Sequence, residues 1–218
     1  MDDILRAITI DWRWVEIHTL AREKIEKIGE GSTREAVFGQ LKEALEIAKT
    51  KVVPKTSLAE IKILNFKPDS LELDGGIVFS TRDLPSHVKG STRICAFLVT
   101  IGKGIEDAAS SHMISDNHLL GYLLDRIGSF AVEYLAENIE SRLRCSLASN
   151  NLSVSSRFSP GYRDWPIEEQ FKLAKIVDFT KAGVILTENC MMIPRKSISA
   201  VVGIGSKELL SNRLSTNF

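Results

Sequence analysis

The apolar residues of the first quarter of the chain recur every three or four positions, as on one face of a helix. This spacing is loose between Trp14 and Ile28 and regular from Val37 to Ala48, where it forms a single apolar stripe. The segment Ser32-Thr33-Arg34-Glu35 precedes the stripe and has the form of a capping box, in which the serine accepts a backbone hydrogen bond and the glutamate bonds back. We therefore predict a second helix that begins at Ser32 and ends before Pro54.

After this helix the pattern changes to that of strands. Asp74-Gly75 separates the apolar segments Leu71–Leu73 and Ile77–Phe79, and such a pair predicts a hairpin because glycine tolerates the positive φ of a tight turn. The segment Ile94–Ile101 is the most apolar run of strand length and is predicted to be a central strand. The other segments with a strand pattern are residues 61–66, 184–186 and 197–202.

A long helix is predicted from about Asp116 to Leu147, and another from Pro166 to Gly183. Gly121 and Gly128 lie on one side of the long helix. Glycine costs a helix about 1 kcal/mol relative to alanine, so we expect another element to approach closely there. The predicted buried stripe of the long helix is Leu120, Leu124, Ile127, Ala131 and Leu135, and the apolar face of the other is Ile167, Phe171, Ala174 and Val177.

The order of these elements predicts an α+β fold. Helices come first, strands follow, and helix and strand then alternate, which favours a mainly antiparallel sheet with flanking helices. No internal repeat, low-complexity segment or linker divides the chain, so we expect a single domain over residues 1–218. Its last dozen residues are polar and are expected to be held loosely.

The composition narrows the possible partners. The chain has 28 Lys plus Arg and 28 Asp plus Glu, so it has no overall attraction for nucleic acid or an anionic membrane. No apolar stretch approaches the roughly 20 residues that span a bilayer. The start, MDDILRAITIDW, is acidic where a signal peptide is basic. We expect a cytoplasmic protein with no nucleic-acid or membrane partner.

The spacing of potential ligands and nucleophiles argues against several kinds of site. Cys95, Cys145 and Cys190 are far apart and form no CxxC pair, so we expect inert thiols and neither zinc nor an iron–sulfur cluster. The four histidines fit neither HExxH nor a catalytic triad, and surface positions are expected for them. Gly102–Asp107, GKGIED, lacks the third glycine of a dinucleotide-binding loop and is interpreted as an ordinary turn after a strand.

One loop combines features that suit an amino-acid nucleoside. Ser159-Pro160-Gly161-Tyr162 fits a type II turn, which presents bare backbone groups at one place. Arg157 offers a planar fork for a carboxylate, and Tyr162 and Trp165 offer aromatic faces for a purine or a sulfonium. S-adenosyl-L-methionine (AdoMet) requires all three. A Pro-Gly turn beside a tryptophan is equally often a well-packed corner, and these residues alone leave both interpretations open.

Two segments resemble the activation domain of vitamin B12-dependent methionine synthase, and more closely its stand-alone form in some bacteria. They are RFSPGYRDWPIEEQ (Arg157–Gln170) and GVILTENCMMIPRKSISAVVGIG (Gly183–Gly205). The family has an Arg-x-x-Pro-Gly-Tyr loop, a helix, and a strand with Pro-x-x-Ser-x-Ser, which here is Pro194, Ser197 and Ser199.

The likeness extends to two further segments. FAVEYLAENIESRLR (Phe130–Arg144) resembles the acidic helix of the family, with Glu133 at the position that helps to hold AdoMet. Ile10-Asp11-Trp12 resembles the Asp-Trp pair whose aspartate also contacts the ligand. The likeness is good from about Val99 to Gly205 and weak before that. After Gly205 the large enzyme adds a strand with a Tyr-Tyr pair at the AdoMet site, and we expect that contribution to be missing or supplied otherwise.

The resemblance implies how AdoMet is held. Arg157 pairs with its carboxylate, Glu133 and Asp11 hold its ammonium, and the backbone of Ser159–Tyr162 contacts adenine and ribose. None of these residues acts as a general acid or base.

Composition alone supports plainer interpretations of several of these residues. Glu133 lies with other polar residues on what the helical pattern predicts to be a solvated face. Ser197 and Ser199 alternate with apolar residues, as on the solvent side of a strand. Arg195-Lys196 fits a docking contact for an acidic partner or an exposed strand end.

The implied function is the reactivation of a methionine synthase whose cobalamin has stalled as Co(II). The chain would act in trans as the activation component of this methyltransferase. AdoMet would supply a methyl group, flavodoxin or ferredoxin an electron, and the partner would carry the cobalamin. Two alternatives stay open: a docking module that binds no AdoMet, and a reactivation module for another corrinoid protein.

Overall fold

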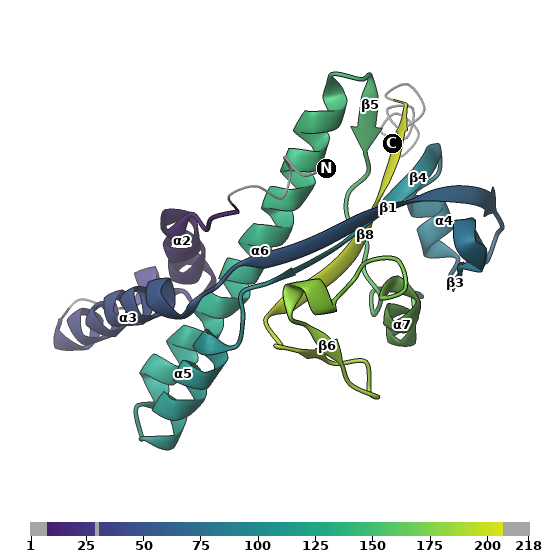
Figure 1. Cartoon of the computed structure of the whole chain (residues 1–218). Coiled ribbons are helices and arrows are strands. Elements are labelled where there is room, and N and C mark those ends of the chain that lie inside the picture. The colour runs from purple at the N-terminus through teal and green to yellow at the C-terminus, as the bar shows by residue number, and fades with distance from the viewer. Residues whose placement is uncertain (1–7, 29–30, 207–218) are drawn as a thin grey trace.

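The computed structural model of the protein describes residues 8–28 and 31–206. Its centre is a six-stranded sheet in which every pairing is antiparallel (Figure 1). The strands are β1 (Lys55–Phe66), β2 (Ser70–Leu73), β3 (Val78–Ser80), β4 (Ser91–Thr100), β5 (Leu152–Val154) and β8 (Ser197–Ser206). Their order across the sheet is β3-β2-β1-β4-β8-β5, and a separate hairpin joins β6 (Ile185–Leu186) to β7 (Met192–Ile193). The predicted α+β fold with a mainly antiparallel sheet is confirmed.

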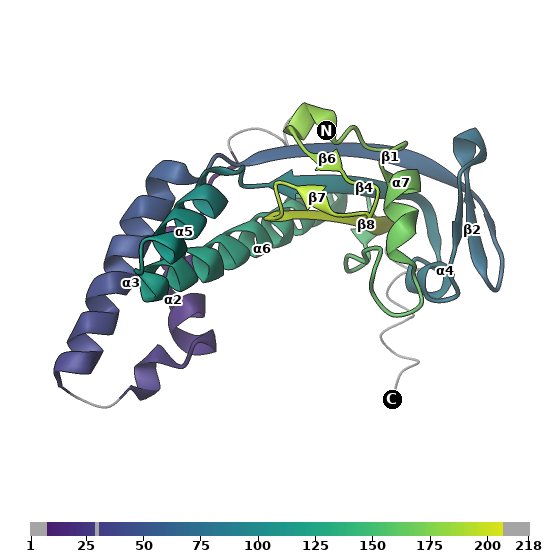
Figure 2. The same cartoon turned by 90° about the horizontal axis from the view of Figure 1, so that it is seen from below.

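The longer helices gather at one end of the sheet and along one of its faces, and two short helices pack on the opposite face (Figure 2). They are α2 (Trp12–Arg22), α3 (Ser32–Lys51), α4 (Asp83–His87), α5 (Gly104–Ile114), α6 (His118–Ala148) and α7 (Gln170–Leu173). Short 3-10 segments are η1 (Ile25–Lys27), η2 (Asp74–Gly76), η3 (Ile167–Glu169) and η4 (Thr180–Ala182). Helix α6 runs beneath the sheet and extends beyond it to lie beside α2, α3 and α5 (Figure 2). No helix of the described ranges is long and apolar enough to cross a bilayer.

The two faces of the sheet pack against different parts of the chain. On β4, Cys95, Phe97 and Val99 face a core that includes the buried side of α6, whereas Ile94 and Ala96 face a core formed with residues 158–184. All of these side chains are completely buried. The prediction of a central strand at Ile94–Ile101 is therefore confirmed, and burial on both faces explains why this run is apolar throughout. Burial raises the pKa of the Cys95 thiol to about 12, as expected for an inert cysteine.

The two glycines of α6 have the packing role that was expected. A Cβ atom on Gly121 would lie 2.8 Å from the carbonyl oxygen of Ala109, and one on Gly128 would lie 3.3 Å from the side chain of Ile105. Both neighbours belong to α5, so the glycines allow α5 and α6 to lie close together. The five predicted stripe residues of α6 are fully buried.

Two local predictions are wrong. Helix α3 begins at Ser32, but its N-cap is Gly31, at φ 115°, and no side chain caps the helix, so the capping box does not form. The single helix predicted over 166–183 is broken into η3, α7 and η4. Asp178 accepts hydrogen bonds from the backbone N–H groups of Thr180 and Lys181, which turns the chain out of the helix.

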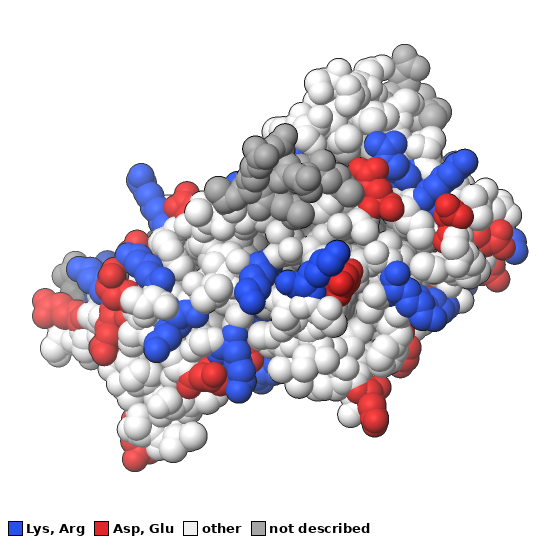
Figure 3. All heavy atoms as spheres, viewed as in Figure 1, with Lys and Arg blue, Asp and Glu red and all other residues white. Residues whose placement is uncertain are grey.

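Ile167 and Phe171, near the start of that segment, were predicted on a buried face but are 38% and 43% exposed, which agrees with the break. The hairpin at Asp74-Gly75 is confirmed, with Gly75 at φ 68°. The prediction for residues 207–218 falls outside the described ranges. On the face shown in Figure 3, basic and acidic side chains are interspersed, in keeping with the balanced composition.

Candidate functional site

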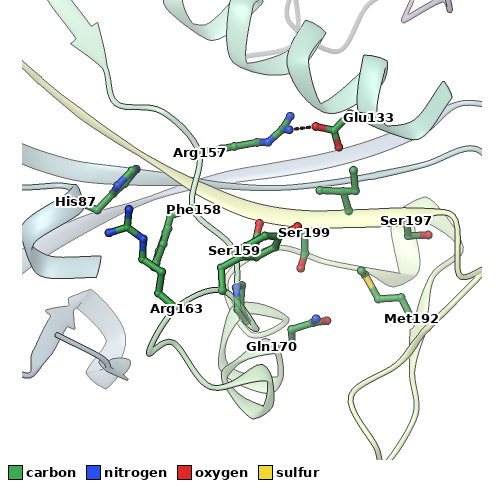
Figure 4. Close-up of a pocket in the computed structure, with 13 residues that line it drawn as sticks. His87, Glu133, Arg157, Phe158, Ser159, Arg163, Gln170, Met192, Ser197 and Ser199 are labelled. Carbon is green, nitrogen blue, oxygen red and sulfur yellow. Dashed lines mark hydrogen bonds and ion pairs between the residues drawn. The ribbon is translucent and has the colours of Figure 1, made fainter. Parts of the chain in front are cut away.

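A cavity of about 530 Å³ lies where α6, the loop after β5, α7 and β8 meet (Figure 4). Five of the seven predicted site residues line it: Glu133, Arg157, Ser159, Pro160 and Tyr162. The lining also includes His87, Phe158, Arg163, Gln170, Met192, Ser197, Ile198 and Ser199. Residues that are separated by more than 100 positions in the sequence thus share one hollow.

An ion pair between two elements forms one side of the cavity. The Nη2 of Arg157 donates a hydrogen bond to Oε1 of Glu133 on α6, and the two side chains are 23% and 39% exposed. Nη1 of the same guanidinium is buried and has no hydrogen-bond partner within the described chain. The helical pattern predicted a solvated face for Glu133, but the residue is held in an ion pair and is not freely solvated. The arginine has an unused donor beside the cavity.

The surroundings of this pair are rich in negative charge. Glu137 lies one turn after Glu133 on α6. Desolvation, followed by the charge of Glu133, raises the pKa of Glu137, while Arg157 and His18 act in the opposite direction. His18 is itself held by stacking on Trp14, with ring centroids 3.6 Å apart. Arg157 thus bonds to Glu133 and also acts through its charge on Glu137, whose negative charge is disfavoured by desolvation and by Glu133.

The predicted turn at Ser159–Tyr162 is present but is more closed than expected. Gly161 has φ 89°, and the Tyr162 N–H donates to the Ser159 carbonyl at 3.3 Å. The Gly161 N–H donates to the Trp165 carbonyl at 2.8 Å. The N–H groups of Gly161 and Tyr162 are therefore not bare, and the prediction is wrong for them. Gly161 forms the turn without lining the cavity.

The two aromatic residues beside the turn have different surroundings. Tyr162 is 68% exposed and lines the cavity. Trp165 is 1% exposed and packs between Phe158 and Phe79, with ring centroids 5.6 and 5.0 Å away. The prediction that Trp165 covers a ligand is wrong, because its ring belongs to the core under the loop.

Asp164 fixes the loop to the start of α4. Its carboxylate accepts hydrogen bonds from Thr81 Oγ1 at 2.7 Å, from the Arg82 N–H at 2.7 Å and from the Asp83 N–H at 3.1 Å. These bonds, that from Thr81 first, lower the pKa of Asp164 to about 2. The anchor holds the loop in place across the ordinary pH range.

Asp11 has a different local role from the other predicted residues. It is the N-cap of α2 and accepts hydrogen bonds from the N–H groups of Arg13 and Trp14 at 3.0 and 3.3 Å. It does not line the cavity. Contact between Asp11 and a ligand stays a prediction.

Strand β8 differs from its predicted exposure. Ser197 and Ser199 are 7% and 3% exposed, so the solvent-side interpretation is wrong. The Ser197 hydroxyl bonds with Thr100 Oγ1 at 2.8 Å and with the Pro194 carbonyl at 2.7 Å. Lys196 is also engaged, since its Nζ lies 2.8 Å from Asp125 and from Ser129 Oγ. It is therefore not a free docking contact for an acidic partner.

Several lining residues had no signal in the sequence. His87, expected on the surface, stacks on Phe158 at 5.0 Å, and its Nε2 lies 2.7 Å from the Ser156 carbonyl. Gln170 and Met192 come from α7 and β7. Gln170 ends the first segment that carries the family resemblance, but only the fold reveals that its side chain faces the cavity (Figure 4).

Comparisons with known proteins concern the family and the fold of the chain. The protein-family model described as "Vitamin B12 dependent methionine synthase, activation domain" matches residues 79–208, which is more than half of the chain. A solved structure, described as the MetH reactivation domain bound to AdoHcy, is similar with a TM-score of 0.57. The identity is 18%, over 89% of this chain and 73% of that chain, which establishes a shared fold. No curated protein sequence matches.

Proposed function

The chain belongs to the family of the vitamin B12-dependent methionine synthase activation domain, and we propose that it binds AdoMet in the cavity beside Arg157. We further propose that it supports reductive methylation of the Co(II) cobalamin of a methionine synthase in trans. The observation that carries the proposal is the Arg157–Glu133 pair in the lining of a cavity of about 530 Å³, with one buried guanidinium nitrogen that has no partner among the described residues.

The charges of this pair complement those of a free amino acid. The AdoMet carboxylate would accept a hydrogen bond from Nη1 of Arg157, which lacks a partner in the described part of the chain. The AdoMet ammonium would lie near Glu133 and Glu137, where two carboxylates face one guanidinium. The amino-acid end of the ligand then adds one charge of each sign, so neither of these two charges is left buried and unpaired. A contribution of Asp11 to the ammonium site is part of the proposal, to be tested separately.

The rest of the ligand would lie along the loop and β8. Pro160 and Ile198 line the cavity with apolar surface, and the exposed ring of Tyr162 would cover a purine. The backbone of Ser159 and Pro160 would contact the ribose.

The contribution of these residues is to position the methyl group toward the corrinoid of the partner. The corrinoid supplies the metal-centred methyl-transfer chemistry, and flavodoxin or ferredoxin supplies the electron. We also propose that the protein carries out this role in the cytoplasm.

Calorimetric titration with AdoMet and with its product S-adenosylhomocysteine (AdoHcy) tests the binding step. We expect Arg157→Ala to weaken both ligands by about 10- to 100-fold, the range for a lost charge-assisted hydrogen bond, with little change in melting temperature. The matched control is Arg126→Ala, which removes another α6-associated arginine–glutamate pair outside the cavity lining and should leave affinity unchanged. A wild-type protein that binds neither ligand would favour the docking module.

The partner is tested by adding the protein, AdoMet and a reductant to Co(II) methionine synthase and following the absorbance of methylcobalamin. We expect methylation that depends on this chain and is lost with Arg157→Ala. Methylation of another corrinoid protein in its place would assign a different client.

A further inference from the structure

One polar side chain in the cavity is buried and makes no hydrogen bond. Gln170, the first residue of α7, is 5% exposed, and its Oε1 is fully buried without a partner among the described residues. Its backbone is engaged, because its carbonyl accepts the Ala174 N–H at 2.9 Å. Gln170 belongs to the lining of the cavity, and Figure 4 shows its side chain among those of the other lining residues. The helix is therefore complete, and only the side-chain amide is unused.

An unused buried amide is unfavourable in the ligand-free protein. Burial removes water from the amide oxygen, and no protein donor replaces it. The adjacent Glu169 does not supply one, since it is a carboxylate paired with Lys172 at 2.7 Å. Buried groups of this kind are rare in native proteins and call for a specific explanation. A ligand in the cavity would supply the missing bonds.

The position of the amide indicates which part of a ligand it would meet. The charged Arg157–Glu133 pair and the neutral Gln170 lie on opposite sides of the cavity, with Ser159 and Ser199 between them (Figure 4). AdoMet has the same polarity: its zwitterionic end is remote from its uncharged purine. If the charged end lies at Arg157, the purine extends toward Gln170.

We propose that Gln170 binds the edge of adenine that carries the exocyclic amino group and N7, with its carbonyl accepting from the amino group and its NH₂ donating to N7. A glutamine amide and this edge are complementary in donors and acceptors. A 6-oxo purine presents two acceptors on that edge, so no orientation of the amide satisfies both. This inference rests on the proposed function, and it makes Gln170 a determinant of specificity for adenine.

The test compares AdoHcy with its deaminated analogue S-inosylhomocysteine on wild-type protein and on Gln170→Met, by calorimetry. We expect the wild type to prefer AdoHcy by about tenfold and Gln170→Met to lose that preference through weaker AdoHcy binding. The melting temperature of ligand-free Gln170→Met should not fall, because no protein hydrogen bond is removed. A purely structural glutamine would show the opposite: lower stability with the preference unchanged.

The controls separate the possible failures. Gln40→Met removes another amide with a buried, unpartnered oxygen, on α3 and outside the cavity lining, and should leave the preference intact. If Gln170→Met does not fold, Gln170→Glu keeps the shape and the acceptor and should still lose the bond to N7. If Gln170→Met loses affinity equally for both ligands, or keeps the preference for AdoHcy, the role of Gln170 is overturned. The proposed function still stands in that case, provided that the wild type binds AdoHcy. No wild-type binding would overturn both.

Discussion

Helix α6 takes part in two arginine–glutamate pairs that differ in how completely they are satisfied. Arg126 on α6 donates to Glu23, the C-cap of α2, at 2.6 Å. The Tyr122 hydroxyl donates to the other oxygen of Glu23, and the Arg126 guanidinium lies 5.1 Å from the Phe130 ring centroid. In the second pair, Glu133 on α6 receives Arg157, which keeps an unused buried donor. The first pair joins two helices, whereas the second has capacity left for a ligand.

The titration behaviour of the neighbouring carboxyls shows the same contrast. Burial tends to raise the pKa of Glu23, but the hydrogen bonds from Tyr122 and Arg126 outweigh it, so the pKa is lowered. Around the second pair, desolvation and the charge of Glu133 raise the pKa of Glu137. A lowered carboxyl pKa means that the fold stabilises the charge, and a raised one means that the charge is disfavoured. The fold therefore stabilises the charge of Glu23 beside the first pair and disfavours the charge of Glu137 beside the second.

The largest effect on affinity is expected from reversing the charge of Glu133 in the second pair. Glu133→Lys places a cation beside Arg157 and where the ligand ammonium would lie, and we expect AdoHcy affinity to fall more than about 100-fold, because juxtaposed like charges cost several kcal/mol. The neutral isostere Glu133→Gln should cost about tenfold. Calorimetry measures both. AdoHcy binding that survives Glu133→Lys would remove this pair from the site.

The next effect is on stability and belongs to the first pair. Arg126→Met leaves the Glu23 side chain, 14% exposed, with Tyr122 as its remaining partner, and should lower the free energy of unfolding by about 1–3 kcal/mol. Affinity for AdoHcy should not change. Because the pKa of Glu23 is lowered by folding, its contribution is present above its ordinary pKa and is lost as the pH falls. Urea titrations should therefore show the difference shrinking below about pH 4.5.

A smaller loss is expected from Tyr122→Phe, which removes the hydroxyl that donates to Glu23. Since Tyr122 is 42% exposed, water partly replaces the bond, and we expect about 0.5–1 kcal/mol. Tyr134→Phe on the same helix is the matched control, because its ring contact with Trp14 at 5.3 Å is kept. Equal losses in the two variants would show that the Tyr122 hydroxyl adds nothing to the first pair.

These two pairs also show what the sequence could and could not predict. The buried stripe of α6 and its two close-packed glycines follow from local spacing, because a helix repeats every 3.6 residues. Neither ion pair has such a signal: the first joins residues 103 positions apart and the second residues 24 apart. Glu133 and Arg157 were assigned to one site from the family resemblance and not from spacing.

The loop segment was harder to predict than the helix because its structure depends on the sheet beneath it. Trp165 has an aromatic ring that could pack on a ligand, but its contacts with Phe79 and Phe158 bury it. Ser197 and Ser199 alternate as on an exposed strand, but residues 158–184 cover that face of the sheet. Gln170 could be found only once α7 was placed at the cavity, since an isolated glutamine carries no pattern.

The smallest expected effect tests whether the charge of Glu137 is disfavoured in the absence of ligand. Because folding raises the pKa of this carboxyl, the folded protein binds its proton more readily than the unfolded chain, so the stability from this group is greatest at low pH and is lost as the pH rises through the folded pKa. Glu137→Gln should therefore raise the melting temperature slightly at pH 8, and the gain should disappear well below pH 4.5.

A control, Glu140→Gln, removes a carboxylate paired with Arg144 at 2.7 Å and should not raise the melting temperature. Bound AdoHcy should reverse the sign, because its ammonium would favour a charged Glu137. Melting curves at both pH values with and without AdoHcy decide the matter: a gain that persists at low pH, or survives saturation with ligand, would mean that Glu137 plays no part in an ammonium site.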